Sequence, residues 1–124
     1  MDHVGENTGL MEMPEAFAYK RPEDVVSFLP EYARGEDFEA KVVALAKYFG
    51  DAGHPEKKDI QRANVFFTNH RTQTKREQMA RSMAKKITHP DKAFRRGLTF
   101  LRHPQGGMYV GQIFISRCWR LIND

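Results

Sequence analysis

The chain of 124 residues is long enough for one hydrophobic core and too short for two independent domains. Hydrophobic residues make up 40% and charged residues 29%, which excludes an intrinsically disordered chain, and the net charge is +4. No apolar run is long enough to cross a bilayer, and no secretory or transit signal is visible, so we expect a cytoplasmic protein without a membrane partner.

The N-terminal part is predicted to hold a tail and a short helix. Residues 1–15 mix glycines and scattered acids without periodicity, so we expect a flexible tail ahead of a single domain over residues 16–124. Pro22 suits a first helical turn, and the two acids after it favour the N-terminal end of a helix. The pattern therefore predicts a short helix that runs to about Leu29.

Two amphipathic helices are predicted next. Apolar residues recur at spacings of four, three and four, which is the mark of one helical face. The residues of this face are Phe38, Val42, Leu45 and Phe49. Gly50 follows as a C-cap, and Pro55 is placed to start another helix. The apolar side of that second helix carries Ile60, Ala63 and Phe67.

A basic helix is predicted over residues 74–87. Thr74 and Glu77 have the spacing of a capping box, in which each side chain bonds the backbone N–H of the other. One face of this helix is apolar and is made of Met79, Ala80, Met83, Ala84 and Ile87. The opposite face is basic and polar and carries Lys75, Gln78, Arg81, Ser82, Lys85 and Lys86. The helix is expected to end at His89-Pro90, because proline disfavours helical geometry in the residue before it.

A β-hairpin is predicted over residues 97–116. Pro104-Gln105-Gly106-Gly107 is a strong turn signal, and residues 108–115 beyond it are rich in branched and aromatic side chains. The expected fold is therefore mainly α with a C-terminal β-hairpin. An all-α bundle is the alternative, because Phe94, Leu98 and Leu101 also fit a helical period.

The charge is distributed unevenly along the chain. Residues 1–40 hold ten acidic residues against three basic ones, whereas residues 41–124 hold seventeen basic residues against six acidic ones. Thirteen of the cations fall between Lys57 and Arg102. If the fold gathers them into one continuous stripe, they predict a polyanionic partner. The alternatives are solvated helix faces, or an acidic N-terminal third that folds back on the basic body.

Residues that usually carry catalytic or metal chemistry are sparse. Cys118 is the one cysteine and is expected to be a small buried apolar residue. The five histidines have no paired spacing, and no glycine-rich phosphate loop or nucleophile motif is present. We therefore expect no structural metal, no cofactor and no catalytic residues, and we do not expect an enzyme.

The order of helices, basic capped helix and glycine-tipped hairpin over residues 36–117 resembles the layout of winged helix-turn-helix DNA-binding domains. The resemblance implies that helix 74–87 enters the major groove and that hairpin 97–116 acts as the wing. Arg and Lys would contact phosphates, whereas Gln78 and Arg81 would read base edges. The expected nucleic-acid-binding residues are Arg71, Lys75, Arg76, Gln78, Arg81, Lys85, Lys86, Arg95, Arg96 and Arg102.

The sequence thus predicts a small DNA-binding regulator, with DNA favoured over RNA. A homodimer is compatible with palindromic sites, and Phe114 with Trp119 is the expected dimer contact. The alternative function is a non-enzymatic protein-binding adaptor or inhibitor, of the kind that phages and mobile elements encode. Such an adaptor would dock its basic surface on an acidic or nucleic-acid-loaded complex.

Overall fold

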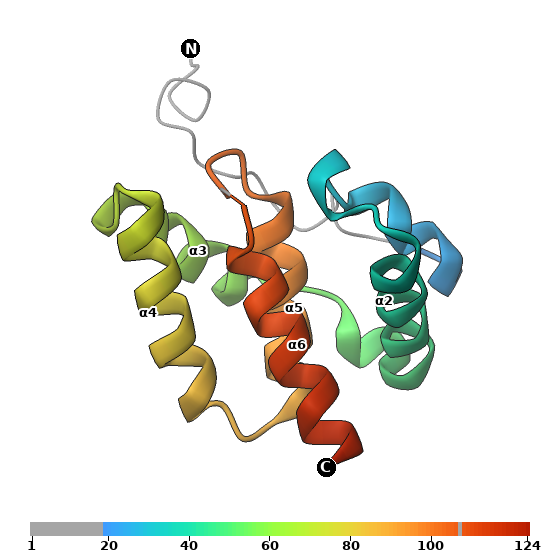
Figure 1. The fold of residues 1–124 in the computed structure, drawn as a ribbon. Coiled ribbons are helices and arrows are strands. Elements are labelled where there is room, and N and C mark those ends of the chain that lie inside the picture. The colour runs from blue at the N-terminus through green and yellow to red at the C-terminus, as the bar shows by residue number, and fades with distance from the viewer. Residues whose placement is uncertain (1–18, 107) are drawn as a thin grey trace.

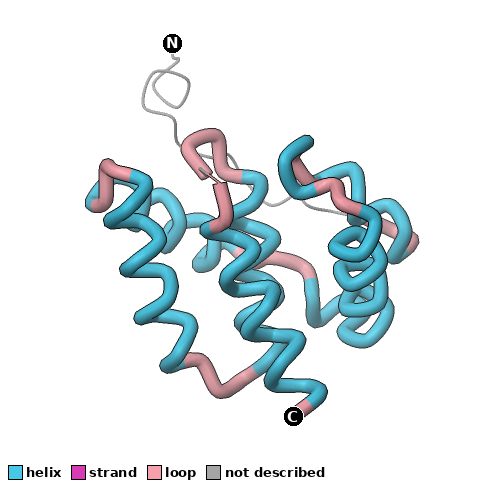
Figure 2. The backbone as a smooth tube through the Cα atoms, viewed as in Figure 1, coloured by secondary structure: helices cyan, strands magenta, loops and turns pink. Residues whose placement is uncertain are grey.

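The regular elements of the chain are helical throughout the described residues, which are 19–106 and 108–124 in this computed structural model (Figures 1 and 2). In chain order they are the 3-10 helices η2 (Pro22–Phe28) and η3 (Glu31–Ala33), α2 (Glu36–Phe49), the 3-10 helix η4 (Gly50–Gly53), α3 (Lys57–Asn69), α4 (Gln73–Lys86), α5 (Pro90–Arg102) and α6 (Val110–Asn123). None of the described helices combines the length and the apolar character that a bilayer span requires. The tail expected over residues 1–15 lies outside the described residues.

α5 is the central helix of the fold. It packs against α6, α3, η4 and η2. α4 packs against α6 (Figure 1). Because neighbours surround it, α5 is buried on nearly every side rather than along one stripe. Its buried residues are Ala93, Phe94, Arg95, Gly97, Leu98, Thr99, Phe100 and Leu101.

Two glycines let α5 and α6 approach each other closely. A Cβ atom added at Gly97 would lie 2.5 Å from Cδ1 of Ile115, and one added at Gly111 would lie 2.8 Å from the carbonyl oxygen of Gly97. Ordinary carbon contacts are 3.5–4.0 Å, so any larger side chain at either position would force the helices apart. This close contact of α5 with α6 at Gly97 and Gly111, which we call the α5–α6 seam, sets the position of α6 and of the cations that α6 carries.

The predicted β-hairpin over residues 97–116 is wrong, and so is the winged helix-turn-helix layout that depended on it. Residues up to Arg102 belong to α5, residues from Val110 onward belong to α6, and no described residue is in a strand. The all-α alternative fits the structure. The turn signal at Pro104 does mark a connection, but it joins two helices. Val110, Phe114 and Cys118 recur every four residues and are all buried, so tertiary packing overrides the strand propensity of the branched residues around them.

The other helices follow the predicted pattern closely. The helix predicted to end at Gly50 is α2, and Gly50 adopts the left-handed φ of +55° that its C-cap position requires. The basic helix predicted over 74–87 is α4, but its N-cap is Thr72, whose side chain accepts from the Lys75 N–H at 3.1 Å. The predicted Thr74 cap is therefore displaced by two residues. Pro90 begins α5 as its first residue.

The expected dimer contact at Phe114 is also wrong. Phe114 is fully buried and packs edge-on against Phe100 at a centroid distance of 4.9 Å. Trp119 is half-buried, and the Lys41 ammonium lies 5.3 Å from its ring centroid. Phe114 is thus core, and it is not available to a second copy of the chain.

A buried histidine joins α3 to the end of α5. The Nδ1 atom of His103 accepts from the backbone N–H of Gln105 at 3.0 Å, so its proton resides on Nε2, which donates to Oδ1 of Asn64 at 2.9 Å. The ring also stacks on Phe67 at a centroid distance of 4.4 Å. Burial, together with the positive charge of Arg76, lowers the pKa of His103 from 6.5 to about 4.

The low pKa of His103 predicts that the free energy of unfolding falls in mild acid. Between pH 6.5 and 4, His103 is protonated in the unfolded chain but not in the folded chain, so the free energy of unfolding falls as the pH falls. Below pH 4 both states are protonated, and the free energy of unfolding falls no further on account of His103. We expect His103 to account for a decrease of about 3 kcal/mol in the free energy of unfolding across this range. Urea unfolding of the wild type and of His103→Gln at several pH values measures it. The difference between the two curves should follow this window, and a constant difference would contradict the prediction.

Candidate functional site

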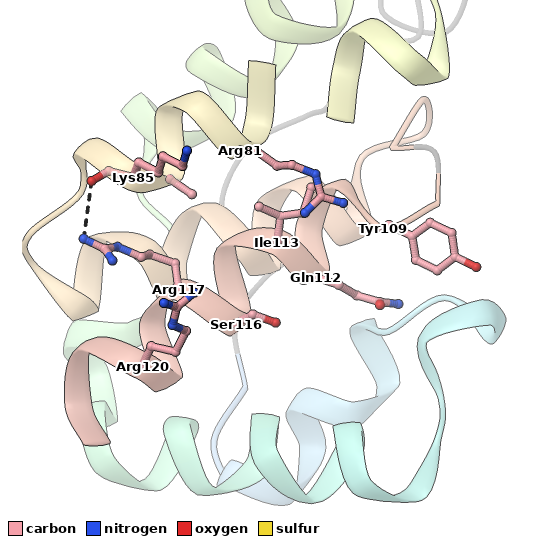
Figure 3. Close-up of a pocket in the computed structure, with 9 residues that line it drawn as sticks. Arg81, Lys85, Tyr109, Gln112, Ile113, Ser116, Arg117 and Arg120 are labelled. Carbon is pink, nitrogen blue, oxygen red and sulfur yellow. Dashed lines mark hydrogen bonds between the residues drawn. The ribbon is translucent and has the colours of Figure 1, made fainter. Parts of the chain in front are cut away.

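A groove between α4 and α6 is the strongest candidate for a functional site (Figure 3). Its volume is about 460 Å³, which lies in the range of ligand-binding clefts. We call it the α4/α6 groove, and its lining residues are Arg81, Ala84, Lys85, Tyr109, Gln112, Ile113, Ser116, Arg117 and Arg120.

Helical spacing explains why four cations meet in this groove. Arg81 and Lys85 are four residues apart and therefore lie on one side of α4. The apolar residues beside them in sequence, Ala80 and Ala84, are buried against the rest of the fold. On α6 the side chains of Gln112, Ser116 and Arg120 recur every four residues, on the side opposite the buried face. The two helices thus turn their polar edges toward a common space.

Arg117 connects the two helices directly. Its guanidinium donates to the carbonyl oxygen of Ile87 from Nε at 3.2 Å and from Nη2 at 2.9 Å, and to that of Lys85 at 3.3 Å (Figure 3). The last carbonyls of a helix have no partner within the helix, and its C-terminus carries a partial negative charge. Arg117 therefore caps α4 and holds it against α6.

The groove is strongly electropositive. Four of its nine lining residues are basic and none is acidic. The carboxylate of Glu77, one turn before Arg81 on α4, lies 3.9 Å from the Arg81 guanidinium. This pair is weak because the Arg81 side chain is 64% exposed to water. Such a groove attracts anions.

No protein-family model, curated protein or solved structure matches the chain. The lining of the α4/α6 groove contains no carboxylate, histidine or cysteine, and its polar groups are four cations, the hydroxyls of Tyr109 and Ser116, and the amide of Gln112. Among the described residues, no group of three His, Cys, Asp or Glu side chains lies together in a way that could hold a metal ion.

Cys118 behaves as a core residue. It is fully buried in α6, as expected from the sequence. Burial, with a smaller contribution from the negative charge of Asp91, raises the pKa of its thiol to about 12. The thiolate is therefore not formed at neutral pH, and Cys118 is not a nucleophile in the folded chain.

Six of the ten residues predicted to bind nucleic acid are exposed on α4 or just before it: Arg71, Lys75, Gln78, Arg81, Lys85 and Lys86. Only Arg81 and Lys85 of this set line the α4/α6 groove. The others lie outside the groove lining. Several of the thirteen cations between Lys57 and Arg102, Arg76 and Arg95 among them, are bonded inside the protein, so not all thirteen belong to one exposed stripe.

Arg76 and Arg95 make their interactions inside the protein. Arg76 donates to backbone carbonyl oxygens of Phe67, His70 and Gln105, and so ties the end of α3 to the α5–α6 connection. Arg95 is buried and pairs with Asp59 at 3.2 Å and with Asp91 at 3.0 Å. Their guanidinium groups are bonded within the protein, and neither residue lines the α4/α6 groove.

Arg96 and Arg102 are also partly buried. The Arg102 guanidinium lies 4.3 Å from the ring centroid of Phe28, an arrangement typical of a cation–π contact. Arg96 is half-buried, and burial together with the nearby charge of Arg62 lowers its pKa. Neither residue lines the α4/α6 groove.

Sequence reasoning missed the α6 half of the groove. Arg117 and Arg120 lie beyond the expected hairpin, and Tyr109, Gln112 and Ser116 were assigned to it. The signal was present in the sequence, because Gln112, Ser116 and Arg120 have helical spacing opposite the apolar residues. Strand propensity in residues 108–115 obscured it.

Proposed function

We propose that this chain is a small, non-enzymatic nucleic-acid-binding protein that holds a sugar–phosphate backbone in the α4/α6 groove. The observation that carries the proposal is the convergence of Arg81 and Lys85 with Arg117 and Arg120, which come from segments distant in the sequence. The proposal includes a cytoplasmic location, where nucleic acid is accessible.

The chemistry of the groove suits phosphates. Arginine donates in a fixed fork that matches the oxygens of a phosphate, and phosphate contacts supply most sequence-independent affinity. A concave surface lined by one sign of charge concentrates its field more than a convex helix does. The uncharged groups of Gln112 and Ser116 line the groove on the Tyr109 side of Arg117 and Arg120 and can bond sugar or base edges.

The proposal is tested by removing two groove cations that have no role in capping α4. Arg81→Ala with Arg120→Ala should weaken binding to labelled oligonucleotides about tenfold or more at about 100 mM salt, because two charge-assisted phosphate contacts are lost. Fluorescence anisotropy with single-stranded DNA, duplex DNA and RNA of one sequence measures this.

The matched control is Lys47→Ala with Lys57→Ala. Both lysines are exposed and lie outside the groove lining, and the change in net charge is identical. We expect this control to stay within about twofold of wild type, since surface charges beyond the Debye length are screened. Equal losses in both double variants would show that net charge, and not the groove, determines binding.

A second candidate function, the protein-binding adaptor or inhibitor, is favoured by another observation. A groove of about 380 Å³ between α3 and α4 is lined by apolar Val65, Phe66 and Met83 beside Lys58 and Arg62. Val65 is 59% exposed, which is unusual for a large apolar side chain in a helix. An adaptor would bind random oligonucleotides weakly, and the groove double variant would then match wild type.

A further inference from the structure

We infer that the α4/α6 groove takes a single strand of nucleic acid and that the ring of Tyr109 stacks on one of its bases. This inference rests on the proposed function and names its substrate class. Tyr109 lines the groove at the start of α6, while Arg117 and Arg120 lie toward the other end (Figure 3). An aromatic ring beside a row of cations is the arrangement by which single strands are bound without sequence preference.

The ring of Tyr109 is accessible to a ligand. The residue is 49% exposed, and within the described residues its ring packs against no other aromatic side chain. Neighbouring Met108 is 48% exposed, so the surface around the ring is apolar as well as open. Exposed faces of this kind receive bases, because every base presents a flat apolar surface.

The backbone below the ring is held in place. Tyr109 has a left-handed φ of +75°, which is costly for a residue with a side chain, and it precedes the first turn of α6. Its carbonyl oxygen accepts from the N–H of Ile113 at 3.0 Å. The side-chain amide of Gln73 donates to the carbonyl oxygen of Met108, which attaches the turn to the beginning of α4. A platform fixed in this way loses little entropy when a base stacks on it.

The geometry favours a single strand over a duplex. In a duplex each base is already stacked and paired, and exposing one to the ring costs a few kcal/mol. From Tyr109 to Arg120 the groove runs about 16 Å along α6, at 1.5 Å per residue. That length accommodates no more than about five nucleotides at the 3.4 Å spacing of a stacked strand. One flexible strand can place a base on Tyr109 and its following phosphates on Arg81 and Arg120.

The test separates the base contact from the phosphate contacts. The probes are a labelled oligothymidine of about 12 nucleotides, an abasic strand of equal length, and a duplex. Wild-type protein should bind oligothymidine about 5- to 100-fold more tightly than the abasic strand, and more tightly than the duplex. Tyr109→Ala should reduce oligothymidine binding to the level of the abasic strand and leave abasic binding unchanged. Tyr109→Phe should keep the wild-type preference, because it keeps the ring.

The outcomes distinguish this inference from the proposed function. If wild type binds oligothymidine and the abasic strand equally, or binds the duplex best, the stacking inference is overturned. The proposed function would still stand if Arg81→Ala with Arg120→Ala weakened both interactions. If wild type binds none of the three probes even at low salt, the proposed function fails and the inference fails with it.

Discussion

Asp59→Ala is expected to lower the free energy of unfolding by about 3 kcal/mol, because it leaves the buried charge of Arg95 with the partly exposed Asp91 in place of two partners. The Asp59 carboxylate is fully buried, accepts from Arg95 at 3.2 Å, and also accepts from the backbone N–H of Glu56 at 2.8 Å. The second bond caps α3, so the variant loses a helix cap as well. Urea denaturation followed by circular dichroism measures the loss.

A double variant tests whether the loss of the Asp59–Arg95 pair is the cause. Asp59→Leu with Arg95→Met replaces both members of the pair by apolar side chains of similar size. We expect it to regain at least half of the lost stability, since apolar replacement of a buried pair is often neutral. A loss below about 1 kcal/mol in Asp59→Ala would contradict the assignment of Arg95 to the core.

Gly111→Ala is expected to cost about 3 kcal/mol or more, although alanine normally favours a helix interior by about 1 kcal/mol. The added Cβ would overlap the Leu101 side chain and would lie 2.8 Å from the carbonyl oxygen of Gly97, where the backbone cannot yield locally. The helices must separate, which moves α6 and its half of the groove. The free energy of unfolding, again from denaturant titration, gives the cost.

Gly35→Ala serves as the control for this substitution. A Cβ added at Gly35 would meet no atom within 4 Å, and the residue has an ordinary φ of −68°. Its replacement should change stability by less than about 1 kcal/mol. Similar effects at Gly35 and Gly111 would show that backbone entropy, and not the α5–α6 seam, explains both.

Local patterns predicted the peripheral helices, because each of them buries one stripe. α2 and α4 show this clearly: their apolar residues have the helical period, and Gly50 and Pro90 mark boundaries. The centre of the fold could not be predicted in the same way. In α5, Phe94, Leu98 and Leu101 have the helical period, but Leu98, Phe100 and Arg102 also alternate as in a strand, and α6 is rich in residues that favour strands.

The candidate site was predicted only in part for a related reason. Arg81 and Lys85 were placed correctly on the polar side of a helix, but the sequence does not show which helix lies opposite them. Arg95 illustrates the reverse problem, because nothing local distinguishes it from a surface cation. Its partner Asp59 is 36 positions away, and only the packing of α3 against α5 brings the two together.

The salt dependence of binding tests the central claim, that the three groove cations not used to cap α4, Arg81, Lys85 and Arg120, contact phosphates. The logarithm of the association constant for single-stranded DNA, measured between about 50 and 200 mM salt, should fall against the logarithm of salt concentration with a slope of about −2. Arg81→Ala with Arg120→Ala should reduce the slope to about −0.7, because two fewer phosphates are neutralised. An unchanged slope in this variant, or a wild-type slope near zero, would contradict the claim.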